Sequence, residues 1–221
     1  MAGNGTVTRI LIPPLLMHKR GGNAILMKRG IIIGLIVSLT LVVTFGVFWF
    51  NTQPVWVVDK KIEKEVLDRL PIKNKKIIEF IEVKGPELAP TYKAAVCTEF
   101  VIKVINNLDP LTKTEKNDIR IMTNAELDSL IEAESPIIKG VQTALVKGGK
   151  GIEIKESMNV LPGDFVQFWN VFQGKGYGHC GIVLNIDPNK TITLYSSHPF
   201  TGGYGKQEYL WPEKIYFVRL K

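Results

Sequence analysis

Acidic residues are missing from the first 50 positions of the chain, which hold five basic residues. This segment therefore supplies +5 of the formal net charge of +7. The remainder, with 23 Lys and Arg against 21 Asp and Glu, is nearly balanced. A nucleic-acid-binding protein carries a basic patch on the domain that binds. The sequence therefore predicts no nucleic-acid partner for residues 51–221.

Histidine and cysteine are also scarce, with three His and two Cys in 221 residues. Beyond residue 50 they are His179, His198, Cys97 and Cys180. A structural zinc site takes four ligands, mostly Cys and His, and this set is poor for that purpose. We expect no metal and no other cofactor. Internal repeats and low-complexity tracts are absent too, and the length allows one domain with extra segments or at most two small domains.

Charge is missing from the apolar run IIIGLIVSLTLVVTFGVFWF, residues 31–50, which is long enough to cross a bilayer as a helix. The run ends in aromatic residues, which suit the membrane interface, and its basic N-terminal flank predicts a cytoplasmic N-terminus. A cleaved signal peptide is the alternative, but its apolar region would be shorter and would end in small residues. We expect a single-pass membrane protein with residues 51–221 outside the cytoplasm.

Residues 51–221 show helix patterns first and strand patterns afterwards. Apolar spacing and capping residues predict helices over 59–70, 90–108, 124–133 and 135–149. Runs rich in β-branched and aromatic residues, bounded by Gly, Pro and Asn, predict strands over 151–156, 164–171, 179–186, 191–197 and 213–220. Residues 109–124 are expected to be loop, and so is the Gly-rich segment 201–212, with a wall of the cleft as its alternative. This order favours an α+β fold with an antiparallel sheet.

Two of the predicted strands flank DPNK, a turn sequence, and should form a hairpin. With Pro188 and Asn189 as the central turn residues, His179 lies opposite His198. Side chains alternate between the two faces of a strand, so Ser196 shares the face of the two histidines while Cys180 points to the other face. A histidine oriented by a second polar group is the usual partner of an activated thiol, although two unrelated surface histidines would give the same pattern.

Cys97 lies near the start of the helix predicted over 90–108. A thiol at a helix N-terminus can have a lowered pKa, and its backbone N–H can help to hold an oxyanion. The alternative is an ordinary buried cysteine, since small core cysteines are common. We expect the helix to pack on the face of the sheet that carries His179. On that expectation Cys180 is a packing residue on the far face. A Cys97–Cys180 disulfide, the alternative for two cysteines outside the cytoplasm, is then not expected.

The order of three motifs resembles the NlpC and CHAP group of papain-like cysteine peptidases, which act on cell-wall peptides. The motifs are CTEFV at Cys97, PGDFVQFW at residues 162–169 and GHCGIV at residues 178–183. In that group they run roughly Cys-Ser/Thr-Gly-Phe-Val, Pro-Gly-Asp-Leu-Val-Phe-Phe and Gly-His-Val-Gly-Ile. The resemblance covers about residues 90–200. The chain differs from the pattern at Glu99, where the group has Gly, and in the long segment 109–160.

The resemblance implies a papain-like fold with Cys97 as nucleophile and His179 as general base. His198 fits the third, orienting position, with Ser196 as the alternative, and Tyr92 could supply a hydroxyl near the site. The chain would then consist of a cytoplasmic basic tail, a transmembrane helix, a tether with a helical segment, and a papain-like hydrolase domain, at residues 1–30, 31–50, 51–85 and 86–221.

The function implied is a membrane-anchored cysteine amidohydrolase or endopeptidase that cleaves amide bonds in peptidoglycan stem peptides. A membrane-anchored, non-catalytic cell-wall-binding or adaptor module on the same fold is the alternative. A toxin or a thiol acyltransferase is a third interpretation, which product analysis would separate. The peptide of peptidoglycan is the expected partner of the outer domain, and the membrane is the expected partner of residues 31–50.

Overall fold

The computed structural model describes residues 55–172 and 174–221. The transmembrane helix and the basic tail that the sequence predicts lie outside these residues. No helix within the described ranges is both long and apolar enough to span a membrane. The described chain has an α+β fold with one seven-stranded antiparallel sheet, in the order β1-β6-β5-β4-β3-β7-β2.

The sheet is built from strands that are distant in sequence. Its strands are β1 (Val55–Val57), β2 (Gly151–Ile154), β3 (Phe165–Phe172), β4 (Lys175–Asp187), β5 (Thr191–His198), β6 (Gly203–Leu210) and β7 (Lys214–Leu220). The five strands predicted from the sequence are all present. The structure adds β1, which pairs with β6 at one edge of the sheet, and β6 itself.

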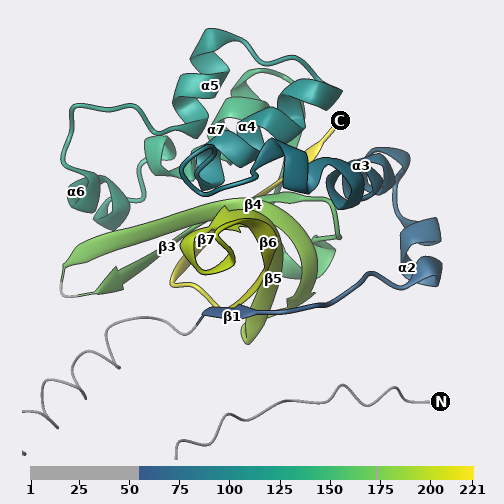
Figure 1. Cartoon of the computed structure of the whole chain (residues 1–221). Coiled ribbons are helices and arrows are strands. Elements are labelled where there is room, and N and C mark those ends of the chain that lie inside the picture. The colour runs from purple at the N-terminus through teal and green to yellow at the C-terminus, as the bar shows by residue number, and fades with distance from the viewer. Residues whose placement is uncertain (1–54, 173) are drawn as a thin grey trace, which may run out of the picture. The chain divides into compact units, whose positions relative to one another are not determined.

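The helices are α2 (Lys64–Arg69), α3 (Ile72–Leu88), α4 (Cys97–Leu108), α5 (Lys113–Ile119), α6 (Leu127–Glu132) and α7 (Val141–Lys147). Short 3₁₀ turns lie at Pro136–Lys139 (η1), Ser157–Asn159 (η2) and Pro199–Thr201 (η3). Figure 1 shows α3, α4, α5 and α7 gathered on one side of a curled sheet, with β1 on the other side.

Apolar side chains on the two faces of the sheet form separate clusters. On the helix side, Phe100 and Val101 of α4 pack with Cys180 and Ile182 of β4 and with Tyr195 of β5. On the other face, side chains of the curled sheet pack on one another; they include Val166, Phe168, Val183, Leu194, Tyr209 and Phe217. The side-chain alternation predicted for the hairpin is therefore confirmed.

Several predicted boundaries are wrong. The helix predicted over 59–70 is restricted to α2, and the one predicted over 90–108 begins only at Cys97. The predicted loop 109–124 contains α5, because Thr112 and Glu115 form a capping box at its start. The predicted loop 201–212 contains β6. The domain boundary placed after residue 85 falls inside α3, which together with β1 belongs to the same folded unit.

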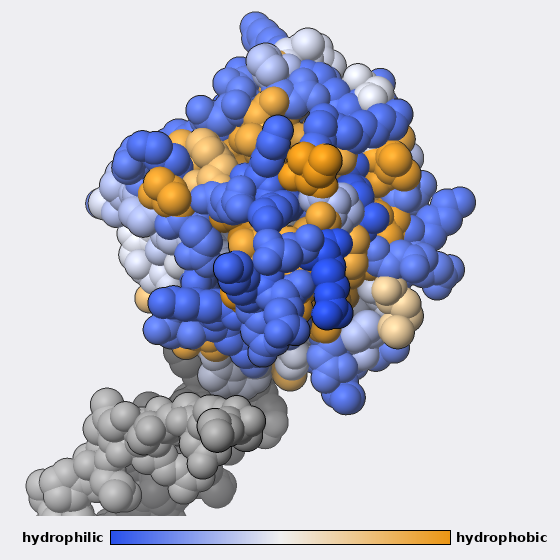
Figure 2. All heavy atoms as spheres, turned by 90° about the vertical axis from the view of Figure 1, so that its right-hand side faces the viewer, coloured by the Kyte–Doolittle hydropathy of each residue, from blue (hydrophilic) through white to orange (hydrophobic). Residues whose placement is uncertain are grey.

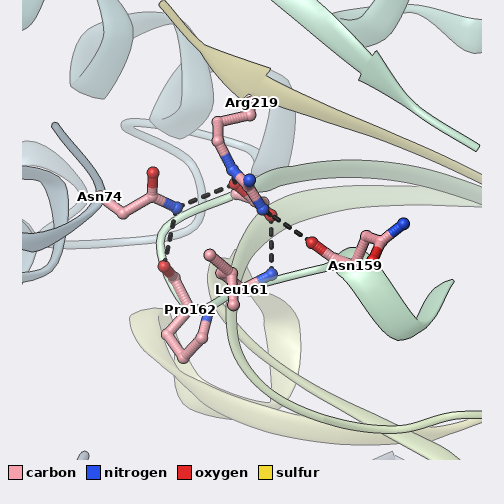
Figure 3. Close-up of polar contacts among 6 residues, drawn as sticks. Asn74, Asn159, Leu161, Pro162 and Arg219 are labelled. Carbon is pink, nitrogen blue, oxygen red and sulfur yellow. Dashed lines mark hydrogen bonds and ion pairs between the residues drawn. The ribbon is translucent and has the colours of Figure 1, made fainter. Parts of the chain in front are cut away.

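The Pro-Gly-Asp turn before β3 is held by a buried carboxylate. Asp164 is fully buried and accepts hydrogen bonds from Arg219 Nε at 2.8 Å, Arg219 Nη2 at 2.7 Å, Asn74 Nδ2 at 2.8 Å and the Leu161 N–H at 2.7 Å. Figure 3 shows this network, in which Asn74 comes from α3 and Arg219 from β7. Both carboxylate oxygens are therefore hydrogen-bonded, by side chains from two distant segments and by a backbone N–H of the turn itself.

The same turn joins the start of β3 to β4. The Gly163 N–H donates to the Val183 carbonyl, and the Val183 N–H donates to the Asp164 carbonyl, each at 2.8 Å. Gly163 has a φ of +90°, and a Cβ there would lie 2.8 Å from the Asn74 carbonyl oxygen, so only glycine fits. The Pro-Gly-Asp motif thus fixes the strand that carries the histidine.

The surface seen in Figure 2 is mainly hydrophilic, with apolar residues scattered among polar ones. Scattered apolar residues are normal on a folded domain. This face therefore offers no continuous apolar patch.

Candidate active site

Cys97 is the first residue of α4 and is partly exposed. The preceding residue, Val96, makes no side-chain cap bond, and the first backbone bond across the helix start is donated by Phe100 to Val96. The N–H groups of the first helical turn therefore have no intrahelical acceptor. The sequence placed Cys97 near the helix start, and the structure places it at the first helical position.

His179 lies on β4 just beyond the point where β4 and β5 stop pairing. The paired residues run from Asp187 and Thr191 at the turn to Ile182 and Tyr195. Beyond them β5 continues to pair with β6 as far as His198, while β4 continues to pair with β3. The N-terminus of α4 lies near this part of β4, because Cys97 and His179 line one pocket.

The hairpin brings the two histidines together as the sequence predicts. The ring centroids of His179 and His198 are 5.3 Å apart, and the rings lie edge to face. The turn itself is one residue longer than expected, since Asp187 pairs with Thr191. A bulge between Val183 and Asn185 compensates for the longer turn, so the expected register returns before the histidine is reached.

Cys180 is a buried packing residue, as predicted, but it does not lie on the face away from α4. α4 packs on the face of the sheet that carries Cys180, not on the face that carries His179, so Cys97 and Cys180 are neighbours. Cys97 also lines one pocket with His179. The reason for expecting no Cys97–Cys180 disulfide, that the two thiols lie on opposite faces, is therefore wrong, although both thiols are free in the structure.

The surroundings of Cys97 favour a thiolate. The neighbouring Cys180 thiol, which can donate a hydrogen bond to the Cys97 sulfur, holds the pKa of Cys97 well below its usual range. Burial opposes this shift, and the charge and hydrogen-bonding capacity of His179 add to it. The pKa of Cys180 is raised by its contact with Cys97 and by complete burial. Of the two thiols, Cys97 is therefore the one whose surroundings stabilise the thiolate.

The proximity of the two thiols leads to a prediction. Treating the full chain with hydrogen peroxide should convert the Cys97 thiolate to a sulfenic acid, which Cys180 then attacks to give a disulfide and water. Intact-mass measurement should show the loss of two hydrogens, reversed by dithiothreitol. In the Cys180→Ser variant the oxidised species should instead carry one added oxygen or more. Loss of two hydrogens in that variant would contradict the pairing.

His198 is held as a neutral ring. Its Nδ1 accepts a hydrogen bond from the Phe200 N–H at 3.1 Å, so in the neutral ring the proton is on Nε2. Burial, together with the charge of His179, lowers the pKa of His198 to about 4. His198 is therefore a donor through Nε2 at neutral pH, which limits how it can serve as the orienting residue.

The other two residues singled out in the sequence have different positions. Ser196 is fully buried and its hydroxyl donates to the Cys180 carbonyl at 2.8 Å, so it joins β5 to β4 instead of facing His179. Tyr92 is tied to the sheet by its N–H, which donates to the Gly202 carbonyl at 2.8 Å. Burial and the charges of Cys97 and Cys180 raise the pKa of its phenol, which places Tyr92 beside the thiols as expected.

A pocket of about 320 Å³ lies in front of Cys97 and His179. Its other walls come from β3 and from residues 120–127, within the long segment that separates the Cys helix from the Pro-Gly-Asp turn. The lining residues include Thr98 of α4, Arg120, Ile121 and Leu127 of that segment, and Gln167 and Trp169 of β3. The segment that departs from the family pattern thus forms part of the pocket wall, which no motif in the sequence indicated.

Glu99, the other departure from the pattern, is neutralised by the same segment. Arg120 donates to its carboxylate from Nε at 2.5 Å and from Nη2 at 3.0 Å. This hydrogen-bonded contact lowers the pKa of Glu99, so the carboxylate remains charged and paired. Glu99 therefore does not place an unpaired negative charge beside Cys97.

Tyr209 is a residue of the site that the sequence did not reveal, because it belongs to the segment expected to be loop. Its ring packs 5.4 Å from that of His179 and 6.2 Å from that of His198. Burial and the charges of the two cysteines raise the pKa of its phenol. A prediction of β6 would have placed this side chain on the face of the sheet that carries the histidines.

Comparisons with known proteins add nothing to this geometry: no family model, curated protein or solved structure matches the chain.

Proposed function

We propose that the chain is a cysteine amidohydrolase or endopeptidase with a papain-like fold, in which Cys97 is the nucleophile and His179 the general base. The observation that carries the proposal is the position of Cys97 at the first residue of α4, in one pocket with His179 and with a lowered thiol pKa. A helix that carries a cysteine at its start and packs on an antiparallel sheet that carries a histidine is what the motif resemblance implies.

The reaction follows from these positions. His179 accepts the proton of Cys97, and the thiolate sulfur attacks the carbonyl carbon of an amide. The N–H groups at the start of α4 stabilise the negative oxygen that develops. His179 then protonates the leaving amine as the C–N bond breaks, which leaves a thioester. Water, deprotonated by His179, cleaves the thioester to a carboxylic acid and restores the thiol.

Peptidoglycan stem peptides are the substrate class that we propose. The support is the resemblance to the NlpC and CHAP group, together with the predicted location of residues 51–221 outside the cytoplasm. The apolar run at residues 31–50 would hold the enzyme at the membrane as a single-pass protein, close to the cell wall.

The test is incubation of the full chain, in detergent or liposomes, with purified peptidoglycan and with soluble stem peptides. New amino groups and peptide fragments should appear, and mass spectrometry should locate the cleaved amide. Binding to peptidoglycan without cleavage would favour the adaptor module instead. Transfer of an acyl group to an added amine, with no hydrolysis, would favour a thiol acyltransferase.

A further inference from the structure

Two polar atoms next to the proposed catalytic pair are buried and unpartnered. Among the described residues, neither His179 Nε2 nor the Tyr209 hydroxyl has a hydrogen-bond partner. The two rings are 5.4 Å apart and inclined by 37°. Buried polar atoms are nearly always hydrogen-bonded, so an unsatisfied pair at a reactive site calls for an explanation.

The reaction itself gives His179 Nε2 a hydrogen to donate. Nε2 is buried and has no partner, so we assign Nδ1 as the nitrogen that accepts the proton of Cys97. A ring that accepts a proton at Nδ1 must already carry its hydrogen at Nε2. Both nitrogens are then donors in the imidazolium, and the Nε2–H needs an acceptor when the thiolate forms.

His198 cannot be that acceptor. Its Nδ1 already accepts from the Phe200 N–H, so its Nε2 also carries a hydrogen. Two N–H groups that face each other repel. The Ser196 hydroxyl donates to the Cys180 carbonyl on the backbone of β4 and makes no hydrogen bond with His179 Nε2, which has no partner among the described residues.

The Tyr209 hydroxyl can accept. It is an oxygen with free lone pairs, carried by β6 on the face of the sheet that carries His179, and Tyr209 is only 5% exposed. We infer that Tyr209 is the positioning residue of the proposed enzyme, its hydroxyl accepting the Nε2–H of His179 directly or through one water when the thiolate–imidazolium pair forms. This inference rests on the proposed function. His198 then only packs against the ring of His179.

The test uses the Tyr209→Phe variant of the full chain, which keeps the ring and removes one oxygen. Because that oxygen has no partner in the resting structure, thermal stability should be unchanged. Loss of a hydrogen bond to a charged group should lower kcat about tenfold with little change in KM. Tyr204→Phe is the matched control, because the Tyr204 hydroxyl is also buried and unpartnered but its ring packs against Phe100 and Tyr195 on the helix side.

A second readout does not depend on the substrate. The rate of Cys97 alkylation by iodoacetamide, followed by peptide mass mapping, should show its pH inflection shifted to higher pH in Tyr209→Phe and unshifted in Tyr204→Phe. An unshifted inflection in Tyr209→Phe overturns the inference, as does a shift in Gln207→Leu alone, since Gln207 Oε1 is another buried, unpartnered acceptor on β6. A shift in Tyr209→Phe without any peptide cleavage by the wild type would sustain the inference and reject the hydrolase.

Discussion

Cys97→Ala is expected to abolish the release of peptides and amino groups from peptidoglycan, with a fall in rate of at least about 1000-fold. The physical reason is that no other group in the pocket can form the thioester. Cys180 is fully buried, and the pKa of its thiol is raised. The expected measurement is the initial rate of peptide release by the variant and the wild type at equal concentration.

The matched control for Cys97→Ala is Cys180→Ala. Removal of Cys180 takes away a hydrogen-bond donor to the Cys97 sulfur, so the rate should fall by no more than about tenfold. Cleavage by Cys97→Ala at the wild-type rate would reject Cys97 as the nucleophile. Complete inactivity of Cys180→Ala, with Cys97→Ala still active, would exchange the roles of the two thiols.

Asp164→Asn is expected to cause a large loss of stability. The variant leaves the Arg219 guanidinium beside a neutral amide. It also replaces one carboxylate oxygen, which accepts hydrogen bonds from Arg219 and from Asn74 or the Leu161 N–H, with an NH₂ group that cannot accept them. Breaking a partly buried ion pair of this kind costs about 3 kcal/mol or more. Thermal unfolding should therefore occur roughly 10 °C lower.

An exposed ion pair provides the control for Asp164→Asn. The distance from Arg69 Nη2 to Glu65 Oε2 is 3.9 Å, and both side chains are exposed. Glu65→Gln should therefore leave the unfolding temperature unchanged. An equal shift in the two variants would mean that the Asp164 network does not hold the Pro-Gly-Asp turn. Because this turn positions β4, Asp164→Asn should also reduce peptide release at temperatures where it is still folded.

The sequence predicted the parts of the site that depend on local patterns. Alternation along β4 and β5 placed His179 and His198 on one face, and capping residues placed a helical start at residue 135, where the η1 turn and then α7 follow. The register was correct near the histidines because two local departures cancel. The turn is longer than DPNK suggested, and a bulge restores the pairing. A bulge has no strong sequence pattern, so this agreement could not have been foreseen.

The features that the sequence predicted wrongly or missed depend on contacts between distant segments. The face of the sheet on which α4 packs is decided by apolar residues of α3, α4 and α7, and alternation within one hairpin does not report it. β6 was missed because its Gly203 and Gly205 resemble loop residues, although Thr201 and the Ala89 carbonyl crowd those positions and require glycine. With β6 missed, Tyr209 was missed as well.

The central claim is that Cys97 is a thiol activated by its neighbours, and one measurement tests it directly. The rate of alkylation of Cys97 in the wild type should be followed from pH 4 to pH 10 by peptide mass mapping. A lowered pKa means that the thiolate persists below the usual range of a cysteine, so alkylation should remain fast at mildly acidic pH. In His179→Ala the pH at which the alkylation rate falls to half should be higher than in the wild type. An inflection of the wild type at or above the ordinary thiol range, unchanged in His179→Ala, would contradict the account.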